Sequence, residues 1–158
     1  MKLSPELNSI LNAQIMHEFK NANIYKQIQS YFEDMQLKNL AEYFKNQSQD
    51  EFNHATKFID YINDRTGGKV TIGEVDAPKF AFMSVESVAD AYMQTEELTT
   101  EKIEEIMDVV LTSKSYMDMG FVQEMLDEQV KEEDEALEFA TKIKMVSDLV
   151  LFDATFGE

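Results

Sequence analysis

The scarcity of helix-breaking residues constrains this chain more than any other feature. Its 158 residues include 5 glycines and 2 prolines, and most of these lie near the chain ends or between residues 66 and 79. Because Gly and Pro interrupt helices most strongly, the long segments between them predict long helices. With 44% apolar residues to fill a core, we predict one all-α domain over residues 1–158.

Capping signals give the helix boundaries. Ser4 followed by Pro5 is typical of an N-cap and a first helical position, Gly67 and Gly68 end a second helix, and Ser84 caps a third. Gly120 falls within the fourth pattern, where we expect it to kink the helix. We predict helices over residues 5–34, 37–64, 84–111 and 115–146, with a short C-terminal helix over about 148–154.

The connection over residues 66–83 is long enough to determine the topology. A helix of about 28 residues is ~42 Å long, whereas 18 extended residues reach ~60 Å. This connection can therefore run the full length of the helices and leave the second and third helices parallel. The other connections are short, so we predict a four-helix bundle with one long crossover.

Charge and composition exclude several function classes. With 14 Lys plus Arg against 31 Asp plus Glu, the net charge of −17 repels nucleic acid and anionic lipid. The absence of cysteine excludes disulfides, thiolate nucleophiles and Cys-type metal sites. No window resembles a signal peptide or the roughly 20 apolar residues of a membrane span, so we predict a cytoplasmic protein.

Each of the four long helices carries polar residues on its otherwise apolar stripe. These residues share the heptad-like spacing of the apolar residues before and after them, so they must point into the core. Each lies near the midpoint of its predicted helix, which places all of them in one layer whichever way each helix runs. The inward-pointing polar residues are Glu18, Glu51, His54, Glu96, Gln129 and Glu132.

Four buried glutamates require a partner. An ionised carboxylate in a dry core costs several kcal/mol, against a total domain stability of only ~5–15 kcal/mol. No Lys or Arg lies on the predicted stripes, so the partner is a metal, or protons when metal is absent. Two divalent cations would balance four carboxylates, and the i, i+3 pair of Glu51 and His54 is the ligand set of carboxylate-bridged di-iron bundles.

Two further residues, Tyr25 and His17, lie near this layer. Tyr25 lies one heptad after Glu18, where it is equally consistent with a core tyrosine and with a hydrogen-bond partner of the site. His17 is turned about 100° away from the ligand stripe, which favours a structural or surface role over ligation.

The same residues carry a family resemblance over essentially the whole chain. The matching pieces are Glu18 with Tyr25, QDEFNH at 49–54, TEELTTEKI at 95–103 and DEQVKEE at 127–133. Together they resemble the bacterial non-haem ferritins, which implies a ferritin-like four-helix bundle. Iron would then be the metal, with no haem.

The resemblance also implies a ferroxidase centre with defined ligands. Glu18, Glu51 and His54 would bind one iron, while Glu51, Glu96 and Glu132 would bind the second, with Glu51 bridging and Gln129 nearby. Two Fe(II) ions would be oxidised by O2 or H2O2. The ferric product would be stored as mineral in a hollow homo-oligomeric cage of twenty-four subunits.

This chain departs from related patterns at three places. Phe52 occupies the position of the haem-ligating Met of bacterioferritins. Asp50, Glu128 and Glu132 match a third iron site found in some bacterial ferritins, but Lys131 replaces one acid there and is expected to weaken that site. The tail lacks the usual glycine-rich turn into the fifth helix, which leaves the form of the fourfold pores open.

Two alternatives remain at the level of sequence. The first is a ferritin-like di-iron oxidase or peroxidase that stores no iron, although such sites usually carry two Glu-x-x-His pairs and this chain has one. The second is a metal-poor structural subunit of a cage.

Overall fold

The computed structural model describes residues 1–82 and 84–157 and contains helices but no strands in that part of the chain. This confirms the all-α prediction. The elements, in chain order, are α1 (Pro5–Asp34), α2 (Lys38–Asp64), α3 (Val85–Thr112), the 3₁₀ turn η1 (Tyr116–Asp118), α4 (Met119–Met145) and α5 (Leu149–Thr155).

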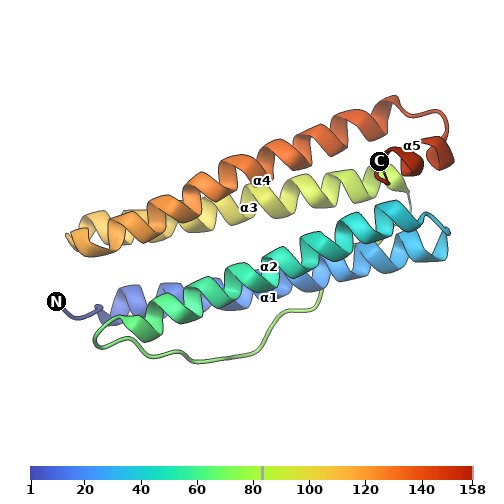
Figure 1. Ribbon diagram of the computed structural model, residues 1–158. Helices are drawn as coiled ribbons and strands as arrows, with labels where there is room; N and C mark the ends of the chain where they lie inside the picture. Colours follow the sequence, from blue (N-terminus) through green and yellow to red (C-terminus); the bar gives the residue numbers. More distant parts are fainter. Residues whose placement is uncertain (83, 158) are drawn as a thin grey trace.

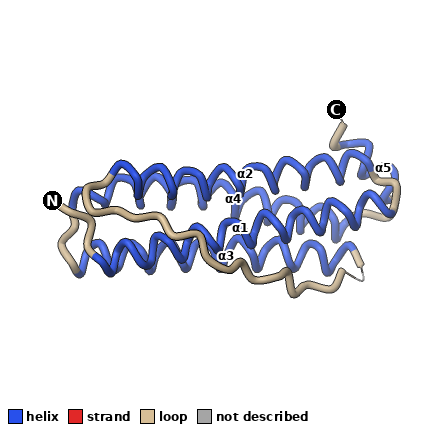
Figure 2. The backbone as a smooth tube through the Cα atoms, turned by 90° about the horizontal axis from the view of Figure 1, so that it is seen from below, coloured by secondary structure: helices blue, strands red, loops and turns tan. Residues whose placement is uncertain are grey.

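The four long helices form a bundle of two antiparallel pairs, α1 with α2 and α3 with α4 (Figure 1). The connection from α2 to α3 runs nearly the whole length of the bundle, on the side of α1 and α3 (Figure 2). As a result α2 and α3 point the same way, as the length of the crossover predicts. Residue 83, the end of the predicted connection, lies outside the described residues.

The helices begin where local capping chemistry allows. The Ser4 hydroxyl accepts a hydrogen bond from the Leu7 amide at 3.1 Å, and Ser84 and Ser87 form a reciprocal capping box at the start of α3. By contrast, α2 has no side-chain cap of its own. Its Leu40 amide instead donates to the Asp153 carboxylate in α5 at 2.8 Å.

The start of the fourth helix differs from the prediction. The chain leaves α3 through Lys114 in a left-handed conformation (φ 56°), makes the 3₁₀ turn, and begins α4 at Met119 rather than at residue 115. Gly120 is therefore the second residue of α4, and the expected kink within that helix was wrong. The 3₁₀ turn over Tyr116–Asp118 and the start of α4 at Met119 account for the break in the helical pattern near Gly120.

The apolar core divides into two halves along the bundle. The half next to α5 is rich in aromatic rings, including Tyr25, Phe44 and Tyr92, whereas the other half is mainly aliphatic. Between them lies a layer of buried polar side chains contributed by all four long helices. None of the helices in the described part of the chain has the length and apolar character needed to cross a bilayer.

Candidate metal centre

The polar layer gathers the residues that the stripe pattern singled out. Glu18 comes from α1, Glu51 and His54 from α2, Glu96 from α3 and Glu132 from α4; all five are buried. Their helices place them at one level because each residue lies near its helix midpoint. The structure thus brings together four carboxylates and one imidazole between two apolar half-cores.

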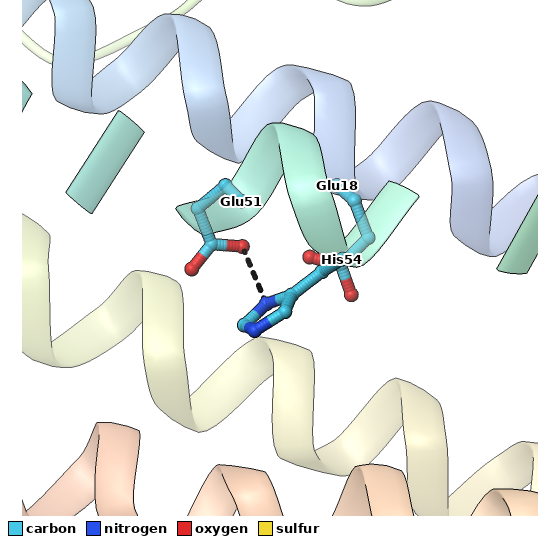
Figure 3. Close-up of side chains that lie close together, drawn as sticks. All are labelled: Glu18, Glu51 and His54. Carbon is cyan, nitrogen blue, oxygen red and sulfur yellow. Dashed lines mark ion pairs between the residues drawn. The ribbon is translucent and has the colours of Figure 1, made fainter. Parts of the chain in front are cut away.

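The first ligand group consists of Glu18, Glu51 and His54. One donor atom from each lies within 4.8 Å of the others, and Nδ1 of His54 is 3.6 Å from Oε2 of Glu51. In Figure 3 the Glu51 carboxylate, the His54 ring and the Glu18 carboxylate approach one another from two neighbouring helices. The i, i+3 spacing on α2 explains why the first two share a face.

The second ligand group consists of Glu51, Glu96 and Glu132, whose carboxylate oxygens also lie within 4.8 Å of one another. Glu51 belongs to both groups, so its two oxygens can serve two adjacent cations. His54 also approaches the second group, with Nε2 3.9 Å from Oε1 of Glu132. The arrangement is two overlapping candidate cation sites that share one carboxylate.

The carboxylates of this layer have raised pKa values and unpaired oxygens. Burial raises the pKa of Glu18, Glu51 and Glu96, and burial followed by the charge of Glu96 raises the pKa of Glu132 to about 8. Four of their buried oxygens have no hydrogen-bond partner among residues 1–82 and 84–157: Oε2 of Glu18, both oxygens of Glu51 and Oε2 of Glu132.

Such unpaired buried acceptors are rare in folded proteins. In the described part of the chain, the ion pairs made by these carboxylates come from His54 alone. Hard oxygen donors with one imidazole suit divalent or trivalent iron, so this layer has the composition and the unsatisfied acceptors of a two-cation site.

Neighbouring polar side chains hold the candidate ligands in place. Nε2 of Gln14 donates to Glu18 at 2.9 Å, Nε2 of Gln129 donates to Oε2 of Glu96 at 3.2 Å, and the Tyr25 hydroxyl donates to Oε1 of Glu96. Tyr25 therefore has both of the roles that its spacing left open. Its ring is buried in the core, and its hydroxyl orients the Glu96 carboxylate.

A second polar cluster lies beside this layer on α1 and α3. Nε2 of His17 is 2.8 Å from the Thr99 hydroxyl, which also accepts from the Asn21 amide at 2.8 Å. Burial, followed by the charges of Lys102 and Lys20, lowers the pKa of His17 to about 3, so the imidazole is neutral at physiological pH. The sequence reasoning missed Asn21, although its position three residues after Glu18 places it on the same face.

The residues of the candidate third site are less closely gathered. Glu128 lies within 4.8 Å of His54 and Glu132 through one donor atom of each. Asp50 is exposed and borders a surface pocket instead. Lys131, which directly precedes Glu132 on α4, is exposed.

Comparisons with known proteins identify relatives of this chain. A non-haem ferritin of Staphylococcus saprophyticus, named "Bacterial non-heme ferritin", is 32% identical over 131 residues, which are 83% of this chain and 78% of that protein. The protein of the same name from Staphylococcus aureus is 33% identical over 132 residues, with the same coverage of both chains.

Solved structures extend the similarity to the fold. A "Humanized Archaeal ferritin" has a TM-score of 0.93 at 26% identity, covering 98% of this chain and 97% of the other. An "open pore ferritin" from Archaeoglobus fulgidus also has a TM-score of 0.93, at 28% identity, covering 98% and 96%. A family model described as a ferritin-like domain matches residues 8–146. The chain therefore belongs to the ferritin-like family.

Proposed function

We propose that this protein is an iron-storage ferritin that oxidises Fe(II) at an intrasubunit two-iron ferroxidase centre. The observation that carries the proposal is the convergence of four buried carboxylates and His54, with four carboxylate oxygens left unpaired. Bound cations would neutralise this layer and occupy its unpaired oxygens, a role that otherwise falls to protons. The names of the relatives, bacterial non-heme ferritins, support iron as the cation.

The two ligand groups give each residue a role. Glu18, Glu51 and His54 hold one Fe(II), while Glu51, Glu96 and Glu132 hold the second and Glu51 bridges the two. Gln129 and Tyr25 orient Glu96 through their hydrogen bonds to its carboxylate. Because hard carboxylate oxygens favour Fe(III) over Fe(II), this donor set makes oxidation favourable.

The proposed reaction delivers two electrons at once. Two Fe(II) ions held side by side give one electron each to O2, which takes up two protons and leaves as H2O2; H2O2 can itself act as the oxidant. With one imidazole among mostly carboxylate ligands, the ferric product is held loosely enough to leave for the mineral. Spectroscopic evidence of Fe(III) retained at Glu51 and His54 through repeated turnovers would contradict this transit.

The protein as proposed stores ferric mineral and binds no haem. The similarity to ferritins supports assembly into a hollow cage of twenty-four subunits in which ferric mineral accumulates. Phe52, at the place of a haem-ligating Met, is exposed and offers no donor atom. The positive charge of Lys131 weakens a third iron site at Asp50, Glu128 and Glu132.

An aerobic Fe(II) titration tests the proposal. Ultraviolet absorbance of ferric iron should rise rapidly up to about two irons per chain and more slowly beyond, and Glu51→Ala should abolish the rapid phase because it removes the shared ligand. Asp134→Ala, an exposed acid on α4, is the matched control. A titration without a saturable step, or a Glu51→Ala protein with unchanged kinetics, would refute the ferroxidase.

A further inference from the structure

Tyrosine is the side chain of this protein that loses one electron most easily, because the sequence contains neither Trp nor Cys. Three of its 6 tyrosines form a continuous line of contacts that begins at the candidate metal centre: Tyr25, Tyr92 and Tyr43. They come from three different helices, so only the tertiary structure makes them neighbours.

The contacts between these tyrosines are close. The Tyr25 hydroxyl donates to Glu96, a candidate iron ligand, and the Tyr25 and Tyr92 rings meet edge to face with centroids 5.4 Å apart. The Tyr92 and Tyr43 hydroxyls are 3.0 Å apart and share a hydrogen bond. Phe44 touches all three rings but has no hydroxyl, so it fills space in the same cluster without being readily oxidised.

The line leads from the interior to the surface. Tyr25 and Tyr92 are fully buried, whereas Tyr43 is only partly buried and borders a surface pocket of about 380 Å³. Asp50, Glu135 and Glu138 also line that pocket, together with Lys142, which pairs with Glu138 at 2.5 Å. The charges of Asp50 and Glu135 remain and give the pocket a negative field that attracts cations such as Fe(II). Burial raises the pKa of Tyr25 and Tyr92, and raises that of Tyr43 to about 12, so all three hydroxyls keep their protons at neutral pH.

We propose that Tyr92 and Tyr43 form a one-electron relay that connects Tyr25 at the metal centre to Fe(II) in the surface pocket. The relay rests on the proposed ferroxidase function and deepens it. The relay acts when H2O2 reaches a centre that holds a single Fe(II). One electron alone would split the peroxide and release a hydroxyl radical, so a second electron is needed from Tyr25.

The electron balance of the relay is complete with Fe(II) as the only reductant. H2O2 takes one electron from the Fe(II) at the centre and one from Tyr25, and with two protons it becomes two waters. The phenolic proton of Tyr25 moves to Glu96 along their hydrogen bond and returns when Tyr92 reduces the Tyr25 radical.

The remaining steps carry the radical outward. Tyr92 releases its proton through the Tyr43 hydroxyl to solvent in the pocket, and a hydrogen atom then passes from Tyr43 to Tyr92. Fe(II) in the pocket returns one electron to Tyr43, and solvent returns the proton. In sum, two Fe(II), one H2O2 and two protons give two Fe(III) and two waters.

Freeze-quench EPR on the assembled protein tests the relay. The protein is loaded with about one Fe(II) per chain, mixed with H2O2, and then given additional Fe(II). The unmodified protein should show a tyrosyl radical that the added Fe(II) removes. In Tyr92→Phe and in Tyr43→Phe the radical should still form at Tyr25, but its decay should slow by about tenfold or more.

Tyr31→Phe is the matched control, since Tyr31 lies outside this line and contacts Phe32 and Phe82; its radical decay should equal that of the unmodified protein. Both test variants keep the aromatic ring. A second readout, hydroxyl-radical spin trapping over repeated additions of Fe(II) and H2O2, should give more adduct in them, because Tyr25 is not reduced again before the next turnover. Equal decay in all variants, or no tyrosyl radical while Fe(II) is still oxidised, would overturn the relay alone. A protein that does not oxidise Fe(II) would refute the ferroxidase itself.

Discussion

Glu51 shows the conflict between stability and function at a single residue. Both of its carboxylate oxygens are buried without a hydrogen-bond partner among the described residues, so either its charge or the proton uptake that neutralises it costs the metal-free fold free energy at neutral pH. Glu51→Gln should raise the melting temperature of the metal-free protein by several degrees because a neutral amide removes this cost. The same change should weaken Co(II) binding, measured by anaerobic calorimetric titration.

Asp134→Asn, an exposed carboxylate on α4, is the control for this substitution and should change neither quantity. A Glu51→Gln protein that melts at a lower temperature than the unmodified metal-free protein would contradict the account of an unpaired buried charge.

The raised pKa values make the stability of the metal-free protein depend on pH. Burial raises the pKa of Glu132 from 4.5 to about 8 and shifts those of Glu18, Glu51 and Glu96 in the same direction. Between these limits the folded chain holds more protons than the unfolded chain, so its stability falls as pH rises. The melting temperature should therefore decline from about pH 5 to about pH 8, as calorimetry would show.

Added Co(II) should remove most of this decline, because cations replace the protons in the carboxylate layer. A melting temperature that is constant or rises over this pH range in the metal-free protein would show that the four carboxylates are not protonated as their burial requires.

Among the elements, α5 supports α2. The α2 helix starts at Lys38 without a side-chain cap, and Asp153 supplies the missing acceptor to the Leu40 amide from the other end of the chain. Asp153→Ala should cost about 1 kcal/mol, the usual value of an N-cap, and lower the melting temperature. Asp60→Ala, on the exposed face of α2, should leave the melting temperature unchanged.

At the opposite end of the bundle, one carboxylate joins α2 to the α3–α4 connection. Asp118 is buried and accepts from Nε of Arg65 at 2.7 Å and from the Tyr61 hydroxyl. Asp118→Ala should destabilise the protein by about 3–5 kcal/mol, because it leaves the Arg65 charge unpaired. Tyr61→Phe removes one hydrogen bond and should cost less; equal melting temperatures for both variants would contradict this ranking.

At the scale of the whole molecule, assembly distinguishes storage from other di-iron chemistry. A cage of twenty-four chains of 18.2 kDa has a mass of about 440 kDa. Light scattering after size exclusion should find this mass, and the assembled protein should take up far more iron than two ions per chain. A dimer that oxidises Fe(II) but retains no mineral would favour an oxidase or peroxidase.

The topology of the bundle follows from one long connection. Since the segment between α2 and α3 spans the bundle (Figure 1), these helices are parallel. The site is aligned because the four long helices have similar lengths of 30, 27, 28 and 27 residues. The positions of Gly and Pro in the sequence predicted the lengths of the helices and of this connection. They did not predict the start of α4, where the chain turns through Lys114 in a left-handed conformation. Asp118, just before α4, contacts Tyr61 and Arg65, which are distant in sequence.

The sequence by itself determined the helices, their faces and the layer of buried acids, because helical periodicity places Glu18, Glu51, Glu96 and Glu132 on apolar stripes wherever the helices pack. The family resemblance implied two groups that share Glu51, whereas periodicity alone did not, and the tertiary structure gives their geometry. Only the tertiary structure decided that Tyr25 reaches Glu96 and that Tyr25, Tyr92 and Tyr43 touch. These facts depend on the rotation and spacing of packed helices, which periodicity within a single helix does not specify.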